Sequence, residues 1–81
     1  MEDYIVMAAM YPTMTSGKVD KFLVKIGDKV SPGTAVAEII SEGYFTLLSE
    51  VAGRVKELYV MEGDYVEVDT AIIEVKLAEE K

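Results

Sequence analysis

Cysteine and histidine are both absent from this sequence. Without cysteine, neither disulfides nor thiolate metal sites can stabilise the chain. Without histidine, most zinc sites lose their usual imidazole ligand, and the commonest general acid or base in catalysis is missing. Ser-His-Asp and Cys-His nucleophile systems are excluded for the same reason. We therefore expect no catalytic residues, no metal site and no enzymatic activity.

Long apolar runs and positive charge are also scarce. No stretch approaches the roughly 20 apolar residues that a membrane span needs. The acidic start, Met1 to Tyr4, does not resemble a signal peptide. Eight basic residues face fifteen acidic ones, and the net charge of −7 disfavours contact with nucleic-acid phosphates. We expect one small domain, residues 1–81, with neither a nucleic-acid nor a membrane partner.

Two segments of the chain are copies of each other. Residues 17–39 align with residues 53–75 without a gap, and because Gly17 meets Gly53 the offset is 36. The identical pairs are Gly17/Gly53, Val19/Val55, Val24/Val60, Gly27/Gly63, Asp28/Asp64, Val30/Val66, Thr34/Thr70, Ala35/Ala71 and Glu38/Glu74. Such agreement predicts two structurally equivalent halves related by a pseudo-two-fold axis.

Each copy has the composition of short β-strands, with many β-branched and aromatic residues and Gly-Asp turns. The predicted strands, paired by the repeat, are 19–25 and 55–60, 29–30 and 65–66, and 34–40 and 70–77. No helical period of 3.6 residues is present. We predict an all-β fold, a flattened barrel or two-sheet sandwich.

Equivalent apolar residues of the two copies are predicted to fill the core between the sheets. They are Val19, Phe22, Val24, Val30 and Ile39, then Val55, Leu58, Val60, Val66 and Val75, joined by Ile5, Met7 and Leu47. Between the copies the sequence predicts a hairpin with a two-residue reversal at Glu42-Gly43, because glycine accepts φ > 0 without a Cβ clash. Glu38 and Glu74 form a carboxylate pair, which the duplication explains without an acid–base role.

Several runs of residues follow the order and spacing of a known family. They are Pro12-Thr13-Met14-Thr15 with Gly17, Gly27-Asp28 and Gly63-Asp64, Ala37-Glu38-Ile39, and Val51-Ala52-Gly53. Over about residues 4–77 the chain resembles the lipoyl domain of the acyltransferase component of pyruvate-dehydrogenase-type complexes, in the biotinyl/lipoyl attachment family. The Gly-Asp pieces alone fit a biotin carrier equally well, so a biotin-carrier-like domain is the alternative. The Pro-Thr-Met-Thr run favours the lipoyl branch.

The resemblance implies a flattened eight-stranded barrel-sandwich with a modified lysine on a tight hairpin. Such a domain is not catalytic but carries a lipoyl group on a swinging lysine between the active sites of a 2-oxo acid dehydrogenase complex. The implied partners are the components of that complex and lipoate ligase, in the cytoplasm or the mitochondrial matrix. The isolated domain is expected to be a monomer, with residues 78–81 as a tail or linker stub.

The chain departs from the family at the modified lysine itself. Counting forward from Ile39 puts that lysine at Gly43, whereas counting back from Gly53 puts it at Glu42. Neither residue is lysine, and one lysine inserted between them would satisfy both counts. Glu42 and Gly43 therefore flank the expected cofactor position. Either the acceptor is deleted, which leaves a structural or assembly module without carrier activity, or a modified lysine omitted from the one-letter sequence carries a lipoyl group there.

Overall fold

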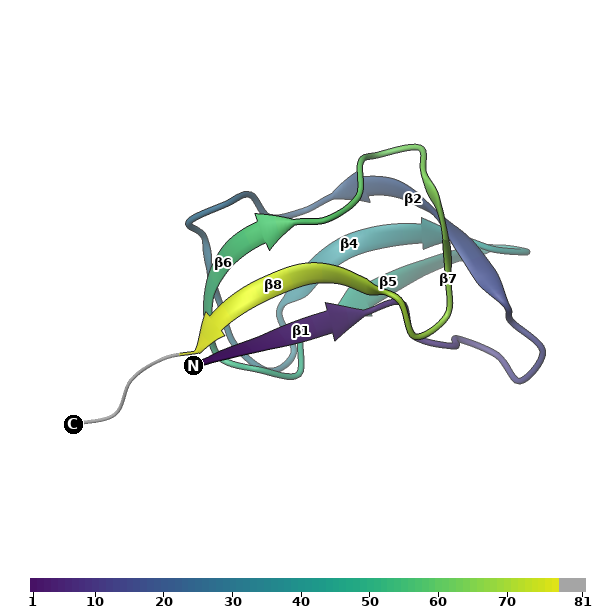
Figure 1. Cartoon of the computed structure of the whole chain (residues 1–81). Helices are drawn as coiled ribbons and strands as arrows, with labels where there is room; N and C mark the ends of the chain where they lie inside the picture. Colours follow the sequence, from purple (N-terminus) through teal and green to yellow (C-terminus); the bar gives the residue numbers. More distant parts are fainter. Residues whose placement is uncertain (78–81) are drawn as a thin grey trace.

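Eight strands form the structure, a computed structural model that describes residues 1–77. They are β1 (Glu2–Val6), β2 (Ser16–Phe22), β3 (Lys29–Val30), β4 (Ala35–Ile40), β5 (Tyr44–Leu48), β6 (Gly53–Leu58), β7 (Tyr65–Glu67) and β8 (Ala71–Leu77). Two antiparallel sheets, ordered β1-β8-β6-β3 and β5-β4-β2-β7, curl around one core (Figure 1). The eight-stranded all-β barrel-sandwich is therefore confirmed. The predicted tail at 78–81 lies outside the described residues.

The two sheets are built alike, as the repeat predicts. At the offset of 36, β2, β3 and β4 correspond to β6, β7 and β8. Replacing each strand by its equivalent turns the order β4-β2-β7 of one sheet into the order β8-β6-β3 of the other, with β5 and β1 at the same edge. Each pair of the β2–β4 ladder recurs 36 positions later in the β6–β8 ladder. The pairs are Lys18–Ile40, Val19–Ile39, Lys21–Glu38 and Phe22–Ala37, then Arg54–Lys76, Val55–Val75, Glu57–Glu74 and Leu58–Ile73. The same one-residue irregularity follows Val19 and Val55.

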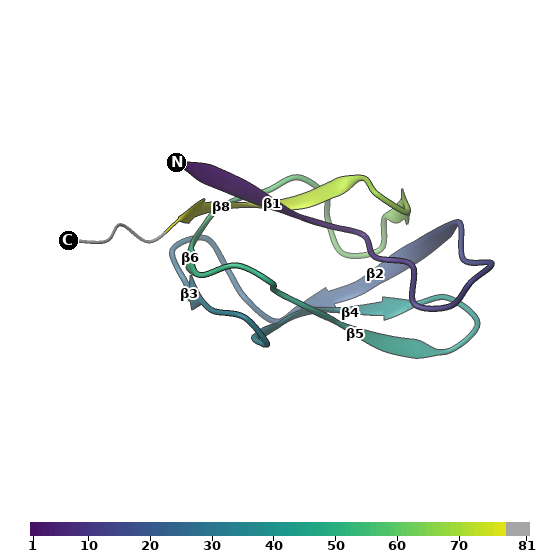
Figure 2. The same cartoon turned by 90° about the horizontal axis from the view of Figure 1, so that it is seen from below.

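The core lies between the two sheets, which face each other in Figure 2. Most predicted core residues are buried: Ile5, Met7, Val19, Val30, Ile39, Leu47, Val55, Val66 and Val75. The prediction missed buried Met14, Val36, Ala37, Ile72 and Ile73. It was wrong to place Phe22, Val24, Leu58 and Val60 inside, since they are only partly buried against the core. Bulges interrupt the two-residue alternation on which the prediction depended.

The first predicted strand of each copy ends earlier than expected, at Phe22 and Leu58 instead of 25 and 60. A turn begins there because an aspartate carboxylate of the Gly-Asp dipeptide accepts a hydrogen bond from a preceding backbone amide. Lys25 donates to Asp28, and Met61 donates to Asp64, both at 2.9 Å. This local bond competes with continuation of the strand.

Gly17 and Gly53 occupy equivalent positions where a side chain has no room. A Cβ on Gly17 would lie 2.6 Å from Ile39 Cγ2, and a Cβ on Gly53 would lie 2.1 Å from the Lys76 carbonyl oxygen. Core side chains leave no space for a Cβ at Gly17, and the backbone of the neighbouring strand β8 leaves none at Gly53, which explains why both copies have glycine here.

Candidate functional site

A three-residue turn joins β4 to β5 at one end of the barrel (Figure 1). Ile40 lies opposite Tyr44, so the turn consists of Ser41, Glu42 and Gly43. The Ser41 amide donates a hydrogen bond to the Gly43 carbonyl at 2.9 Å. Gly43 has φ of 152°, and Glu42 has φ of 58°, the left-handed region that is unfavourable for residues with a Cβ. Both residues are exposed, so the turn presents the Glu42 carboxylate to solvent.

Hydrogen bonds hold the base of this hairpin against the start of β2 and the loop that precedes it. Ser41 Oγ donates to the Ser16 carbonyl at 3.0 Å. Because a hydroxyl has one proton, the Tyr11 hydroxyl must be the donor to Ser41 Oγ, at 2.7 Å. The Tyr11 ring also packs against Phe45, with 5.9 Å between the ring centroids. These contacts fix the start of the turn while its tip remains exposed.

The Pro-Thr-Met-Thr run places Tyr11 beside the hairpin. The Met14 amide donates to the Tyr11 carbonyl at 3.1 Å, which closes a β-turn with Pro12 at its second position. Met14 is buried, and its sulfur lies 3.2 Å from the Met10 amide. Sequence reasoning missed the roles of Tyr11 and Ser41, which lie 30 positions apart, because no local pattern connects them.

None of the three turn residues is lysine. Within residues 1–77 the lysines lie in strands or near the turn at Gly27: Lys18 and Lys21 in β2, Lys25 after it, Lys29 in β3, Lys56 in β6 and Lys76 in β8. Lys25, expected on a strand, lies beyond the end of β2. Lys18 pairs with Ile40, the last strand residue before the turn, but lies on another strand.

A family model of biotin/lipoyl type, described as biotin-requiring enzyme, matches residues 4–75. The chain belongs to this family. Two curated relatives of the biotin/lipoyl domain are acyltransferase components. The acetyltransferase component of the Rickettsia conorii pyruvate dehydrogenase complex is 54% identical over 35 residues, 43% of this chain and 8% of that protein. The succinyltransferase component of the Staphylococcus saprophyticus 2-oxoglutarate dehydrogenase complex is 38% identical over 61 residues, 74% of this chain and 14% of that protein.

A solved structure has the same fold as this biotin/lipoyl domain. It is the lipoyl domain of the 2-oxoglutarate dehydrogenase complex from Azotobacter vinelandii, with a TM-score of 0.69 and 20% identity over 93% of this chain and 99% of that one. At this identity the likeness concerns the fold alone. The chain spans only a small part of its two curated relatives, 8% of one and 14% of the other. The match to such a small part does not assign the activity of either whole protein to this chain.

The turn of this biotin/lipoyl domain does not fit a covalently attached lipoyl or biotinyl group. Attachment to lysine needs a side-chain amine, and Ser41, Glu42 and Gly43 have none. The Ser41 hydroxyl is already engaged with Tyr11 and Ser16. Glu42 and Gly43 lie in the hairpin turn, which has three residues where the sequence predicted two, and they offer no attachment atom.

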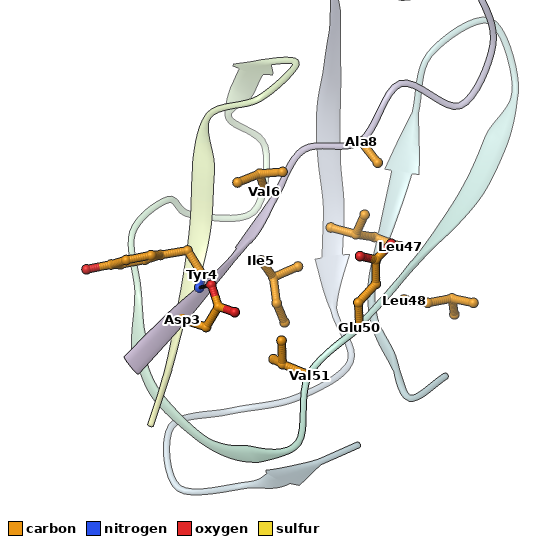
Figure 3. A pocket seen from close by; sticks show the side chains of 9 residues that line it. All are labelled: Asp3, Tyr4, Ile5, Val6, Ala8, Leu47, Leu48, Glu50 and Val51. Atoms are coloured by element: carbon orange, nitrogen blue, oxygen red, sulfur yellow. Dashed lines mark hydrogen bonds between the residues drawn. The ribbon is translucent and has the colours of Figure 1, made fainter. Parts of the chain in front are cut away.

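A surface groove lies between the edge strands β1 and β5, away from the hairpin turn. Figure 3 shows Ile5 and Val51 pointing toward each other in this groove of about 230 Å³. Asp3 and Glu50 also line it, whereas the Tyr4 ring points away. Residues 1–77 contain neither a cluster of three or more potential metal ligands nor a helix long and apolar enough to span a membrane.

The repeat-related Glu38 and Glu74 lie in different sheets, and Glu74 has a structural role. Its carboxylate accepts a hydrogen bond of 2.5 Å from the Tyr59 hydroxyl, which raises the pKa of Tyr59 to about 12. Lys56 lies 3.5 Å from Glu74 and also pairs with Glu2. The hydrogen bond and charge of Lys56 hold the pKa of Glu2 below its usual value. This network explains Glu74 without acid–base chemistry.

Proposed function

We propose that this chain is a non-catalytic lipoyl-type domain of a 2-oxo acid dehydrogenase complex in which Glu42-Gly43 takes the place of the lipoyl-lysine. The single observation that carries the proposal is that the hairpin turn, where the resemblance places the carrier lysine, has no amine. The acyltransferase relatives support the assignment to such a complex, in the cytoplasm or the mitochondrial matrix.

Without the acceptor, the domain keeps the shape of a carrier and loses the transfer of acyl groups. Its rigid hairpin, held by Tyr11 and Ser41, presents an exposed carboxylate where a carrier presents its modified side chain. Such a module binds the same protein surfaces as a carrier domain and contributes to assembly. As an isolated chain we expect it to be monomeric.

Intact mass after coexpression with lipoate ligase tests this function. The natural chain should return its unmodified mass, whereas a variant with one lysine inserted between Glu42 and Gly43 should gain one lipoyl group per chain. A variant with arginine inserted at the same place controls for the longer loop, because its guanidinium is not an acceptor. Modification of the natural chain would refute the loss of the acceptor. A lysine-inserted chain that folds but stays unmodified would refute the assignment of the turn as the carrier position.

The description of the matching family as biotin-requiring favours a second candidate, a biotin-carrier-like domain. The same lysine-inserted variant distinguishes the two, because each ligase attaches only its own group. Modification by biotin ligase and not by lipoate ligase would support the biotin carrier.

A further inference from the structure

Four side chains form a row across the outer face of the sheet that contains the hairpin. Lys18 lies opposite Tyr65 on one side and Ile40 on the other, and Ile40 lies opposite Tyr44. Directly opposed residues share one face of a sheet. Because Val19, the neighbour of Lys18, is buried, this row faces solvent. We call Tyr65, Lys18, Ile40 and Tyr44 the tyrosine row; it ends one residue after Gly43.

The other sheet supplies an internal comparison for the tyrosine row. The equivalent row there, at the same ladder positions, consists of Lys29, Arg54, Lys76 and Glu2. All four of those residues are charged and exposed, as expected of a solvated face. The fold accepts charged residues at each of these positions, so it does not require two tyrosines and an isoleucine in the tyrosine row.

The exposed area of the tyrosine row indicates the kind of contact that it can make. Tyr44 and Tyr65 are 76% and 77% exposed. Two such rings offer on the order of 300–400 Å², less than the roughly 800 Å² per partner of a stable interface. A second copy of the chain would therefore form no stable dimer through this row. The area fits a small, transient contact, in which tyrosine is a favoured residue.

Carboxylates surround the row. Glu42 lies in the adjacent turn, Glu67 follows Tyr65 by two residues in β7, and Glu38 lies two residues before Ile40 in β4. With a net charge of −7 on the whole chain, these groups favour a partner surface that is basic. Lys18 is the one cation within the row itself.

We propose that the tyrosine row is a docking surface for a component of a 2-oxo acid dehydrogenase complex whose contact surface has an apolar centre and a basic rim. The identity of the partner rests on the proposed function, whereas the position of the surface rests on the comparison between the two sheets. The row places such a partner directly beside the hairpin turn.

The test is a nuclear magnetic resonance titration of the ¹⁵N-labelled natural chain with purified components of a pyruvate dehydrogenase complex, each added separately. One component should broaden or shift the amide signals of the tyrosine row at low salt, and the effect should weaken as salt is added. A Tyr44→Ser/Tyr65→Ser variant should bind about tenfold more weakly, as expected when interface tyrosines are truncated. The matched control is Glu2→Ser/Lys29→Ser, which changes the equivalent positions of the other sheet and should alter affinity less than about twofold.

Several results would overturn the docking surface. One is a component that binds but changes the amide signals of residues outside the tyrosine row. Another is a component whose affinity falls equally for the two double variants. A third is that no component changes the amide signals of the chain. Signal changes that depend on the concentration of the chain alone would identify a second copy as the occupant instead. Dispersed spectra of both variants exclude unfolding as the cause. The lipoylation of the lysine-inserted chain fails or succeeds independently of these outcomes, so the two proposals can be refuted separately.

Discussion

The hydrogen bonds at the base of the hairpin lead to a quantitative prediction about Tyr11 and Ser41. Tyr11→Phe removes one bond, the 2.7 Å donation to Ser41 Oγ. Ser41→Ala removes that bond and the 3.0 Å donation to the Ser16 carbonyl. At about 1 kcal/mol for each bond, the free energy of unfolding should fall by about 1 kcal/mol for Tyr11→Phe and about 2 kcal/mol for Ser41→Ala.

The double variant decides whether the two residues act through one contact. Since Ser41→Ala already removes the bond to Tyr11, Tyr11→Phe should cost nothing further, and the double variant should lose about 2 kcal/mol. The coupling energy is then about 1 kcal/mol. Urea unfolding measures it, with far-ultraviolet circular dichroism as the signal.

Additive losses, about 3 kcal/mol in the double variant, would refute this reasoning, because they would show that the two hydroxyls are stabilised separately. Tyr44→Phe is the matched control. The Tyr44 side chain is 76% exposed, so removing its hydroxyl should change stability by no more than about 0.5 kcal/mol. A large loss there would mean that the hairpin depends on its exposed face.

Three further predictions concern the scaffold. Gly17→Ala should lower the free energy of unfolding by about 1–3 kcal/mol. Gly53→Ala should lower it by more, because the new Cβ would meet backbone 2.1 Å away instead of a movable side chain. Equal losses for the two variants in urea unfolding would contradict this. Asp69 has φ of 78°, so Asp69→Val should cost about 1–2 kcal/mol in the same assay while Asp69→Gly should not destabilise; a tolerated valine would contradict the geometry. The hydrogen bond to Glu74 raises the pKa of Tyr59 from 10.0 to about 12. The stabilisation from this bond is therefore complete below pH 10 and is lost as pH rises through 12. In an ultraviolet titration Tyr59→Phe should remove the ionisation near pH 12, and its persistence would contradict the prediction.

Much of the fold could be predicted from the sequence because the repeat constrains it twice. The Gly-Asp turns and the identical pairs located the strands within each copy, and the structure confirms that the two copies are equivalent. The ends of β2 and β6 and part of the core were missed, because bulges shift the inward face of a strand without changing its composition. Phe22 and Leu58, predicted in the core, lie after these bulges.

The candidate site was only partly predictable. The turn at Glu42-Gly43 followed from the hairpin pattern, which depends on neighbouring residues alone, and its interpretation as a site followed from the family resemblance. The bond between Tyr11 and Ser41 depends on how a loop folds back over 30 positions. The tyrosine row depends on the register of four strands, since Tyr44 and Tyr65 lie on opposite edges of one sheet. No local pattern reports such contacts.

The duplication makes the two sheets each other's reference. The fold constrains equivalent positions alike, so a difference between them reflects something other than the fold. On the sheet without the hairpin, Glu74 accepts a hydrogen bond from Tyr59 and pairs with Lys56 on the outer face. Their equivalents at the offset of 36, Asp20, Leu23 and Glu38, contain no cation and form no such network within the described residues. One outer face thus satisfies its own polar groups. The face beside the turn leaves its side chains available to a partner.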